Sequence, residues 1–299
     1  MSAGIAAAVV LLSILLSRML TRKISTLLTA IRKVRAGAYE HRTHISGRDE
    51  IAQIGEEFNS LTDRLQTTET MRRRFVSDAS HELKTPLAAI RLLTDSILQT
   101  DQMDMETVRD FVTDIGSEAE RLSRITEDLL RLTRLDSDLL DAPETVEVAP
   151  VLEQVMRMMS LLAQKKGTEL TYRMEENCRV SATKGEVHQV IYNLTDNAVK
   201  YSGQNGKVRV ELRHEDHDVV LTVADNGPGI PEEDLPKVFE RFYRVDKARS
   251  RAAGGTGLGL SIVQDTVKKR GGTVSAANRA GGGAVFTVRW PEAEGGDHS

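Results

Sequence analysis

The sequence has a single cysteine in 299 residues, Cys178, which excludes a disulfide framework within the chain and any cysteine-rich zinc site. It also has little net charge, because 40 Lys and Arg face 44 Asp and Glu. A protein dedicated to nucleic acid is basic over a whole domain, so no direct nucleic-acid partner is expected. A charged content of 28% and a hydrophobic content of 40% exclude both a disordered tail and a polytopic membrane protein.

The N-terminus has no charged side chain from Met1 to Ser17, and its run Ile5–Leu16 is apolar throughout. A full membrane span takes about 20 apolar residues, so the transmembrane helix predicted at 1–17 is short and an N-terminal part is expected to precede it. Residues 18–48 carry eight Lys or Arg against one Glu, which is a net charge of +7. This asymmetry predicts an anchor in the cell membrane with everything C-terminal to it in the cytoplasm. The alternatives are a buried helix and an artefact of where the sequence starts.

Residues 18–68 show two helical patterns on either side of a break at Ala36-Gly37-Ala38. The second pattern has apolar residues at the a and d positions of a coiled coil, which require a partner helix. The apolar positions of the two helices are Ile24, Leu27, Leu28, Ile31 and Val34, then Ile51, Ile54, Phe58, Leu61 and Leu65.

Residues 69–137 predict two longer antiparallel helices joined by a polar turn at 100–104. Their apolar residues are Leu83, Leu87, Ile90, Leu93 and Ile97, then Val108, Phe111, Ile115, Ala119, Leu122, Ile125, Leu129 and Leu132. Two such helices cannot cover their own apolar stripe, so we expect a homodimer that forms a four-helix bundle. A plain coiled coil is the alternative.

The segment Ser80-His-Glu-Leu-Lys-Thr-Pro86 distinguishes the first of these helices. His81 lies off the apolar seam, Thr85 shares its face, and Glu82 is adjacent, which is a plausible arrangement for a nucleophile and a base. A zinc-protease signature would need a second histidine where Thr85 stands. His41 and His44 lack accompanying ligands and are interpreted as solvated.

Residues 138–292 predict an α+β sandwich, after a short linker at 141–145 and before a disordered tail at 293–299. Alternating apolar residues mark the strands, which are expected at 169–172, 207–212, 219–223, 273–275 and 284–288. Helices are expected at 149–165, 184–200 and 259–270.

Four segments of this domain carry candidate ligand groups. Asn193 and Asn197 share one helix face, where amide oxygens suit Mg²⁺ that carries phosphates, and Lys200 can reach phosphate. Asp225-Asn-Gly-Pro-Gly-Ile230 follows a strand, and Gly254–Leu260 is a glycine loop that opens a helix. The fourth segment is Val238–Arg244. Taken singly, these are also typical of helix caps, surface positions and turns.

In this order after the His81 segment, the four segments resemble those of a bacterial two-component sensor histidine kinase. Residues 80–86 are similar to the phosphoacceptor box, and the four segments are similar to the N box, the two glycine boxes and the F box of a GHKL-type ATP-binding domain. Residues 18–68 resemble a HAMP relay module, although Ile24-Ser25 stands where such modules have a proline. The resemblance extends over roughly residues 18 to 290.

The resemblance implies a role for each matching residue. His81 would take the γ-phosphoryl group of ATP, Glu82 would act as the base, and Thr85 would position water when phosphate is removed from the partner. Asn197 and Asn193 would hold Mg²⁺, Lys200 and Arg244 would contact phosphates, Tyr201 would flank the adenine, and Asp225 would bind its amino group. The other implied nucleotide-binding residues are Gly227, Gly229, Ile230, Phe239, Gly255, Thr256, Gly257, Leu258 and Gly259. Residues 245–256 would form a lid.

The same resemblance implies that phosphate passes to an aspartate of a response regulator in trans, with phosphatase activity toward that partner. Two other functions use the same nucleotide fold. One is an ATPase of the kind found in chaperones or topoisomerases, which leaves the His81 segment and the dimer seam unexplained. The other is a membrane-tethered helical scaffold that only senses ATP.

Overall fold

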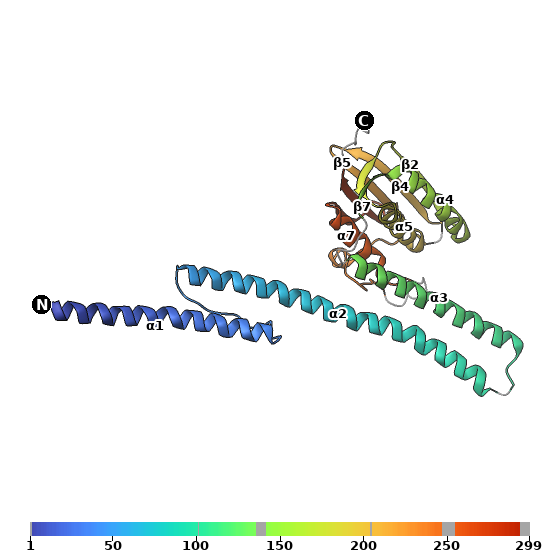
Figure 1. The fold of residues 1–299 in the computed structure, drawn as a ribbon. Helices are drawn as coiled ribbons and strands as arrows, with labels where there is room; N and C mark the ends of the chain where they lie inside the picture. Colours follow the sequence, from blue (N-terminus) through green and yellow to red (C-terminus); the bar gives the residue numbers. More distant parts are fainter. Residues whose placement is uncertain (1, 101, 136–141, 204, 247–254, 294–299) are drawn as a thin grey trace. The chain divides into compact units, whose positions relative to one another are not determined.

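The structure is a computed structural model that describes residues 2–100, 102–135, 142–203, 205–246 and 255–293 (Figure 1). The chain divides into two compact units, Met1–Asp78 and Ala79–Ser299. Linker residue 141, tail residues 294–299 and most of the predicted lid lie outside the described residues.

Helix α1 (Ser2–Arg35) is continuous across the predicted boundary between membrane segment and relay module. Its stretch Gly4–Arg35 is long and apolar enough to cross a membrane, and the most apolar part of this stretch is not buried against the rest of the structure. The helix ends where predicted, two residues before Gly37, and Ala38 N–H returns to the Lys33 carbonyl. Apolar residues of the first helical pattern, such as Ile24 and Ile31, are exposed in the single chain.

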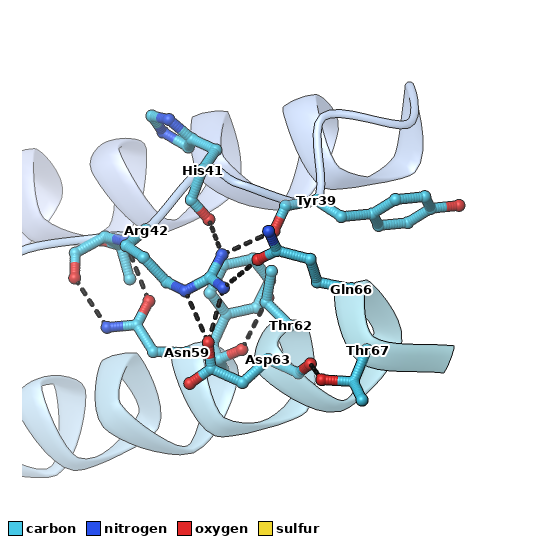
Figure 2. Close-up of polar contacts among 10 residues, drawn as sticks. Tyr39, His41, Arg42, Asn59, Thr62, Asp63, Gln66 and Thr67 are labelled. Atoms are coloured by element: carbon cyan, nitrogen blue, oxygen red, sulfur yellow. Dashed lines mark hydrogen bonds and ion pairs between the residues drawn. The ribbon is translucent and has the colours of Figure 1, made fainter. Parts of the chain in front are cut away.

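Residues 36–49 connect α1 to the first part of α2 (Glu50–Gln99) and lie along that helix, held by two polar side chains (Figure 2). The Arg42 guanidinium donates to the Asp63 carboxylate, to Gln66 and to the carbonyls of Tyr39 and His41. Asn59 pairs with both backbone groups of Thr43, at 2.9 Å each. Side chains thus satisfy backbone groups of Tyr39, His41 and Thr43 in a connector without regular secondary structure.

Asp49 caps the start of α2. Asp49 Oδ1 accepts from the backbone N–H of Ala52 at 3.0 Å, which satisfies one of the free donors of the first turn. Its other oxygen accepts from Lys23 of α1 at 2.6 Å. This pair joins α1 to the start of α2 within the first unit.

Helix α2 continues without interruption through residue 69 and through Pro86. In the second unit it faces α3 (Met105–Leu135), and Ile125 and Leu132 of α3 are fully buried. An apolar groove between the two helices is lined by Ser80, Leu83, Lys84, Leu87, Leu122 and Thr126. Leu87 remains 59% exposed there, so the single chain leaves part of the predicted seam uncovered.

The C-terminal domain contains a five-stranded sheet in the order β2-β4-β5-β7-β6. Its strands are β2 (Glu169–Met174), β4 (Lys207–Glu215), β5 (Asp218–Asp225), β6 (Thr273–Asn278) and β7 (Ala284–Pro291). β2 is parallel to β4 and the other pairs are antiparallel. Helices α4 (Val148–Lys166), α5 (Lys184–Tyr201) and α7 (Gly259–Lys269) pack on the sheet (Figure 1). The predicted α+β architecture is confirmed.

Two short strands were not predicted. β1 (Glu144–Glu147) pairs antiparallel with β3 (Arg179–Ala182), so the predicted linker is wrong for Glu144 and Thr145. Beyond β7, Ala293 donates to the Arg179 carbonyl, which places this first residue of the predicted tail against β3.

Helix α5, which carries the two asparagines, is stabilised at its first turn. Thr183 and Glu186 form a reciprocal capping box, and the Glu186 carboxylate also receives Arg270 at 2.8 Å. Both members of this ion pair are about nine-tenths buried. Loss of one partner would leave a buried charge, so the pair constrains α5 against the end of α7.

The reactivity of the Cys178 thiol provides a test of the packing of this domain. Its side chain is fully buried, and burial, followed by the nearby carboxylates of Glu175, Glu292 and Glu147, raises its pKa to about 11. Because the thiolate is the reactive form, we expect no reaction with Ellman's reagent at pH 8 in the folded protein. In guanidinium chloride one thiol per chain should react. Prompt labelling of the folded protein would contradict the packing described here.

Candidate functional site

The His81 imidazole is exposed on α2 and has no hydrogen-bond partner within the described residues. Thr85, one turn later, is also exposed, and its hydroxyl donates to the His81 carbonyl at 3.1 Å. An exposed, unpartnered imidazole is free to act as a nucleophile toward a group brought to it.

The carboxylate of Glu82 is directed toward α3 and the C-terminal domain. Its Oε2 accepts from Arg121 of α3 and from Arg244, each at 3.1 Å. The arginine side chains are only 7% and 5% exposed. The structure therefore brings together Glu82 and Arg244, two predicted site residues, but it does not pair Glu82 with the His81 ring.

A cavity of about 860 Å³ lies between α3, α5, the end of β5 and the start of α7. Most of the predicted nucleotide-binding residues line it: Asn193, Asn197, Lys200, Tyr201, Asp225, Gly229, Ile230, Arg244, Gly255, Thr256, Gly257 and Gly259. Residues more than 60 positions apart in the sequence thus share one concave site of the size that small ligands occupy.

Three predicted residues do not line the cavity but support its wall. Leu258 is fully buried, and Phe239 packs edge-to-face on Phe286 of β7, with ring centroids 6.3 Å apart. Gly227 N–H donates to Asp225 Oδ1, and a Cβ on Gly227 would lie 2.4 Å from the Tyr201 carbonyl oxygen. Glycine is therefore required there by close approach to the backbone of α5.

Asp225 is oriented by the backbone. Its Oδ1 accepts from the N–H groups of Gly227 at 2.8 Å and Ala284 at 3.2 Å. Within the described residues, Oδ2 has no donor, so it can accept from a ligand in the cavity. Burial raises the pKa of this carboxyl, and the two N–H groups and then Arg279 oppose the rise.

The two asparagines of α5 differ in their hydrogen bonds to the described residues, since Asn193 makes two and Asn197 makes none. Asn193 accepts from Gln189 at 2.8 Å and donates to the Gly259 carbonyl at 3.1 Å, which ties α5 to the start of α7. Asn197 is half-buried and has no hydrogen bond to a described residue. Lys200 is paired with Asp196 at 2.6 Å. No cluster of three or more His, Cys, Asp or Glu within the described part of the chain could hold a metal.

The sequence did not reveal the contribution of α3. Arg124, Glu127, Asp128 and Arg131 line the cavity, and the Thr256 hydroxyl donates to Asp128 Oδ2 at 2.8 Å. Burial raises the pKa of Asp128, against the effects of Thr256, Arg131 and Lys200. No local pattern on α3 indicates these contacts, because they join residues far apart in the chain.

The predictions also missed several α5 side chains that line the cavity, among them an aromatic pair. His188 and Tyr192 stack one turn apart, with ring centroids 6.4 Å apart. Burial lowers the pKa of His188, with Arg131 adding to the effect, and burial followed by Asp196 raises that of Tyr192. The helical period from Gln189 through Asn193 to Lys200 could have indicated this face.

Three family models match consecutive parts of the chain. Residues 15–67 match the HAMP domain, and residues 71–138 match the His Kinase A (phospho-acceptor) domain. Residues 182–294 match the histidine kinase-, DNA gyrase B- and HSP90-like ATPase. His81 lies in the second match, and the α5, β5 and α7 walls of the cavity lie in the third.

Curated relatives extend over nearly the whole chain. It is 34% identical over 313 aligned residues to the signal transduction histidine-protein kinase AfsQ2 of Streptomyces coelicolor, covering 97% of this chain and 57% of the relative. It is 31% identical over 283 residues to the signal transduction histidine-protein kinase BaeS of Escherichia coli, covering 94% of this chain and 60% of the relative. The chain belongs to the sensor histidine kinases.

This sensor histidine kinase spans about three-fifths of the length of these curated relatives. Among solved structures, it is similar to full-length ShkA in complex with AMPPNP, with 29% identity and a TM-score of 0.54. That match covers 74% of this chain and 46% of ShkA. The architecture of apolar helix, HAMP module, phosphoacceptor helices and α/β ATPase domain agrees with the predicted fold class.

Proposed function

We propose that this chain is an ATP-dependent protein-histidine kinase that phosphorylates its own His81 and transfers the phosphoryl group to an aspartate of a separate response regulator. One observation carries the proposal. An exposed imidazole lies in a phosphoacceptor domain, and the adjoining ATPase domain has a cavity with free acceptors on Asp225 and Asn197. The AMPPNP bound to the relative ShkA supports a nucleoside triphosphate as the ligand.

In the proposed reaction an imidazole nitrogen of His81 attacks the γ-phosphorus of ATP. The bond from that phosphorus to the β–γ bridging oxygen breaks, and ADP leaves with the electron pair. The other ring nitrogen gives its proton to a base, which we assign to Glu82. Phosphoryl transfer needs mainly positioning and charge neutralisation, so the domain that holds ATP must present it to α2.

The side chains that we assign to the nucleotide all line the cavity. Asp225 Oδ2 accepts from the adenine amino group, and Tyr201 flanks the ring. Asn197 offers a hard amide oxygen to Mg²⁺, which would neutralise phosphate charge when bound. Asn193 Oδ1 already accepts from Gln189 and Lys200 is already paired with Asp196, but the second lone pair of the amide oxygen and the other ammonium protons leave capacity for Mg²⁺ and phosphate.

The dimer is proposed from the uncovered groove between α2 and α3. Leu83, Leu87 and Leu122 line it, and two copies would bury it in a four-helix bundle. We expect Leu87→Glu to shift the detergent-solubilised chain from dimer to monomer, because it places a charge in that seam. Leu92→Glu is the matched control, since Leu92 is 68% exposed on the same helix and lies outside the groove. Light scattering with subtraction of detergent mass distinguishes the two, and a dimeric Leu87→Glu would exclude this seam.

The remaining parts of the proposal concern location and partner. The apolar, unburied helix near the N-terminus and the positive residues after it support a cell-membrane anchor with the catalytic domains in the cytoplasm. The phosphoacceptor family match supports a response regulator as the partner, with Thr85 positioning water in its dephosphorylation.

The proposal is tested by incubating the detergent-solubilised chain with [γ-³²P]ATP and Mg²⁺. We expect label on the protein that is lost in acid and kept in alkali, which is the behaviour of a phosphohistidine. ATP hydrolysis without protein label would instead favour a simple ATPase. Nucleotide binding without either activity would favour the scaffold that only senses ATP.

A further inference from the structure

Two carboxylates of the phosphoacceptor helices bind side chains that the resemblance assigns to the nucleotide. Asp128 of α3 accepts from the Thr256 hydroxyl at 2.8 Å, and Glu82 of α2 accepts from Arg244 at 3.1 Å. Thr256 and Arg244 both line the cavity. The helical domain therefore presents negatively charged oxygens to two groups that would otherwise receive a phosphate.

The Thr256 hydroxyl cannot serve both ligands at once. It has one proton, which it donates to Asp128, and its oxygen already accepts from the Leu258 N–H at 3.2 Å. Thr256 is only 9% exposed and lies two residues before Leu258, the N-cap of α7. A phosphate that takes this proton must displace the Asp128 carboxylate.

Charge makes the two ligands exclusive as well. The charged groups that affect Asp128 are Arg131 and Lys200, which favour its ionised form, and Glu127, which opposes it. A phosphate beside Thr256 would be repelled by the Asp128 carboxylate and attracted by Arg131 and Lys200. The raised pKa of Asp128 shows that burial disfavours its charge, so a second anion beside it would be costly.

We infer that Asp128 is an internal competitor of the nucleotide phosphates, and that ATP binds only when Thr256 leaves Asp128. This inference rests on the proposed function. While Asp128 holds Thr256, the ATPase domain has a low affinity for nucleotide. Binding of ATP breaks this contact between α3 and the ATPase domain. Any signal that separates α3 from Thr256 then raises the affinity for ATP without changing the residues that touch the adenine.

The test compares Asp128→Asn with Asp114→Asn in the detergent-solubilised full chain. Asp114 lies on the exposed surface of the same helix and outside the cavity. Dissociation constants are measured for ATP, by displacement of a fluorescent nucleotide, and for adenosine, by calorimetry. We expect Asp128→Asn to bind ATP about tenfold more tightly, which corresponds to about 1.4 kcal/mol, and adenosine unchanged. Asp114→Asn should match the unmodified chain for both ligands.

Unchanged or weaker ATP binding in a folded Asp128→Asn variant would overturn the inference, as would an equal gain for adenosine, because the effect would then not involve phosphate. Asp128→Ala removes the hydrogen-bond acceptor as well as the charge, and it should show the same gain for ATP. If the unmodified chain binds no nucleotide, the proposed function itself fails, which is distinguishable from a failure confined to Asp128.

Discussion

Replacing His81 with glutamine is expected to abolish the acid-labile label completely while leaving the affinity for ATP unchanged. Glutamine has no nucleophilic ring nitrogen, so no phosphoramidate can form. The side chain is exposed and has no hydrogen-bond partner within the described residues, so its loss should change the free energy of unfolding by less than about 0.5 kcal/mol. Phosphorimaging, a thermal melt and nucleotide titration on the same preparation measure the three quantities.

His44→Gln is the matched control, because His44 is also exposed but lies in the connector of the relay module. It should retain full labelling. Label that survives His81→Gln would identify another acceptor and contradict the assignment. Loss of label together with loss of ATP binding would mean that the substitution had damaged the nucleotide site, which its position on α2 makes unexpected.

Much of the C-terminal domain could be predicted because its elements carry strong local signals. Helices α5 and α7 begin at the predicted residues and end within one residue of the prediction. The alternation of Val208, Val210 and Leu212 matches their burial in β4. β1 and β3 were missed because each has four residues and pairs with a strand far away in the chain, so neither has a local pattern of sufficient length.

The predicted domain boundaries at 17/18 and 68/69 do not coincide with the end of a helix. The first follows the appearance of charged residues at Arg18 and the second follows the division that the resemblance implies, and the chain has no glycine or proline near either position to end a helix. α1 and α2 consequently continue through both.

The cavity was predictable where one helix or loop supplies several residues, as α5 and the start of α7 do. The partners of the site residues were not. Arg121 binds Glu82 across 39 positions, and Asp128 binds Thr256 across 128. Such pairs depend on how α3 packs against the rest of the second unit, and no periodicity within a single helix encodes them.

Asp225→Asn is expected to weaken ATP binding by about 100-fold and to change which purine is preferred. The Asp225 carboxylate is held by Gly227 and Ala284 through Oδ1, which leaves Oδ2 to accept from the adenine amino group. In the variant, the amide oxygen keeps the two backbone bonds and the amide NH₂ takes the place of Oδ2. Two donors then face each other, and a hydrogen bond to a charged group, worth about 1.5–3 kcal/mol, is replaced by a repulsion.

Inosine triphosphate separates this mechanism from general damage to the site. Its purine has a carbonyl oxygen where adenine has the amino group, so the unmodified chain should bind it weakly and Asp225→Asn should bind it better than ATP. Asp218→Asn, at the other end of β5, should leave both affinities unchanged. If Asp225→Asn weakened the binding of both nucleotides equally in a folded protein, Asp225 would be stabilising the loop rather than recognising the base. A reversed preference requires that its free oxygen face position 6 of the purine.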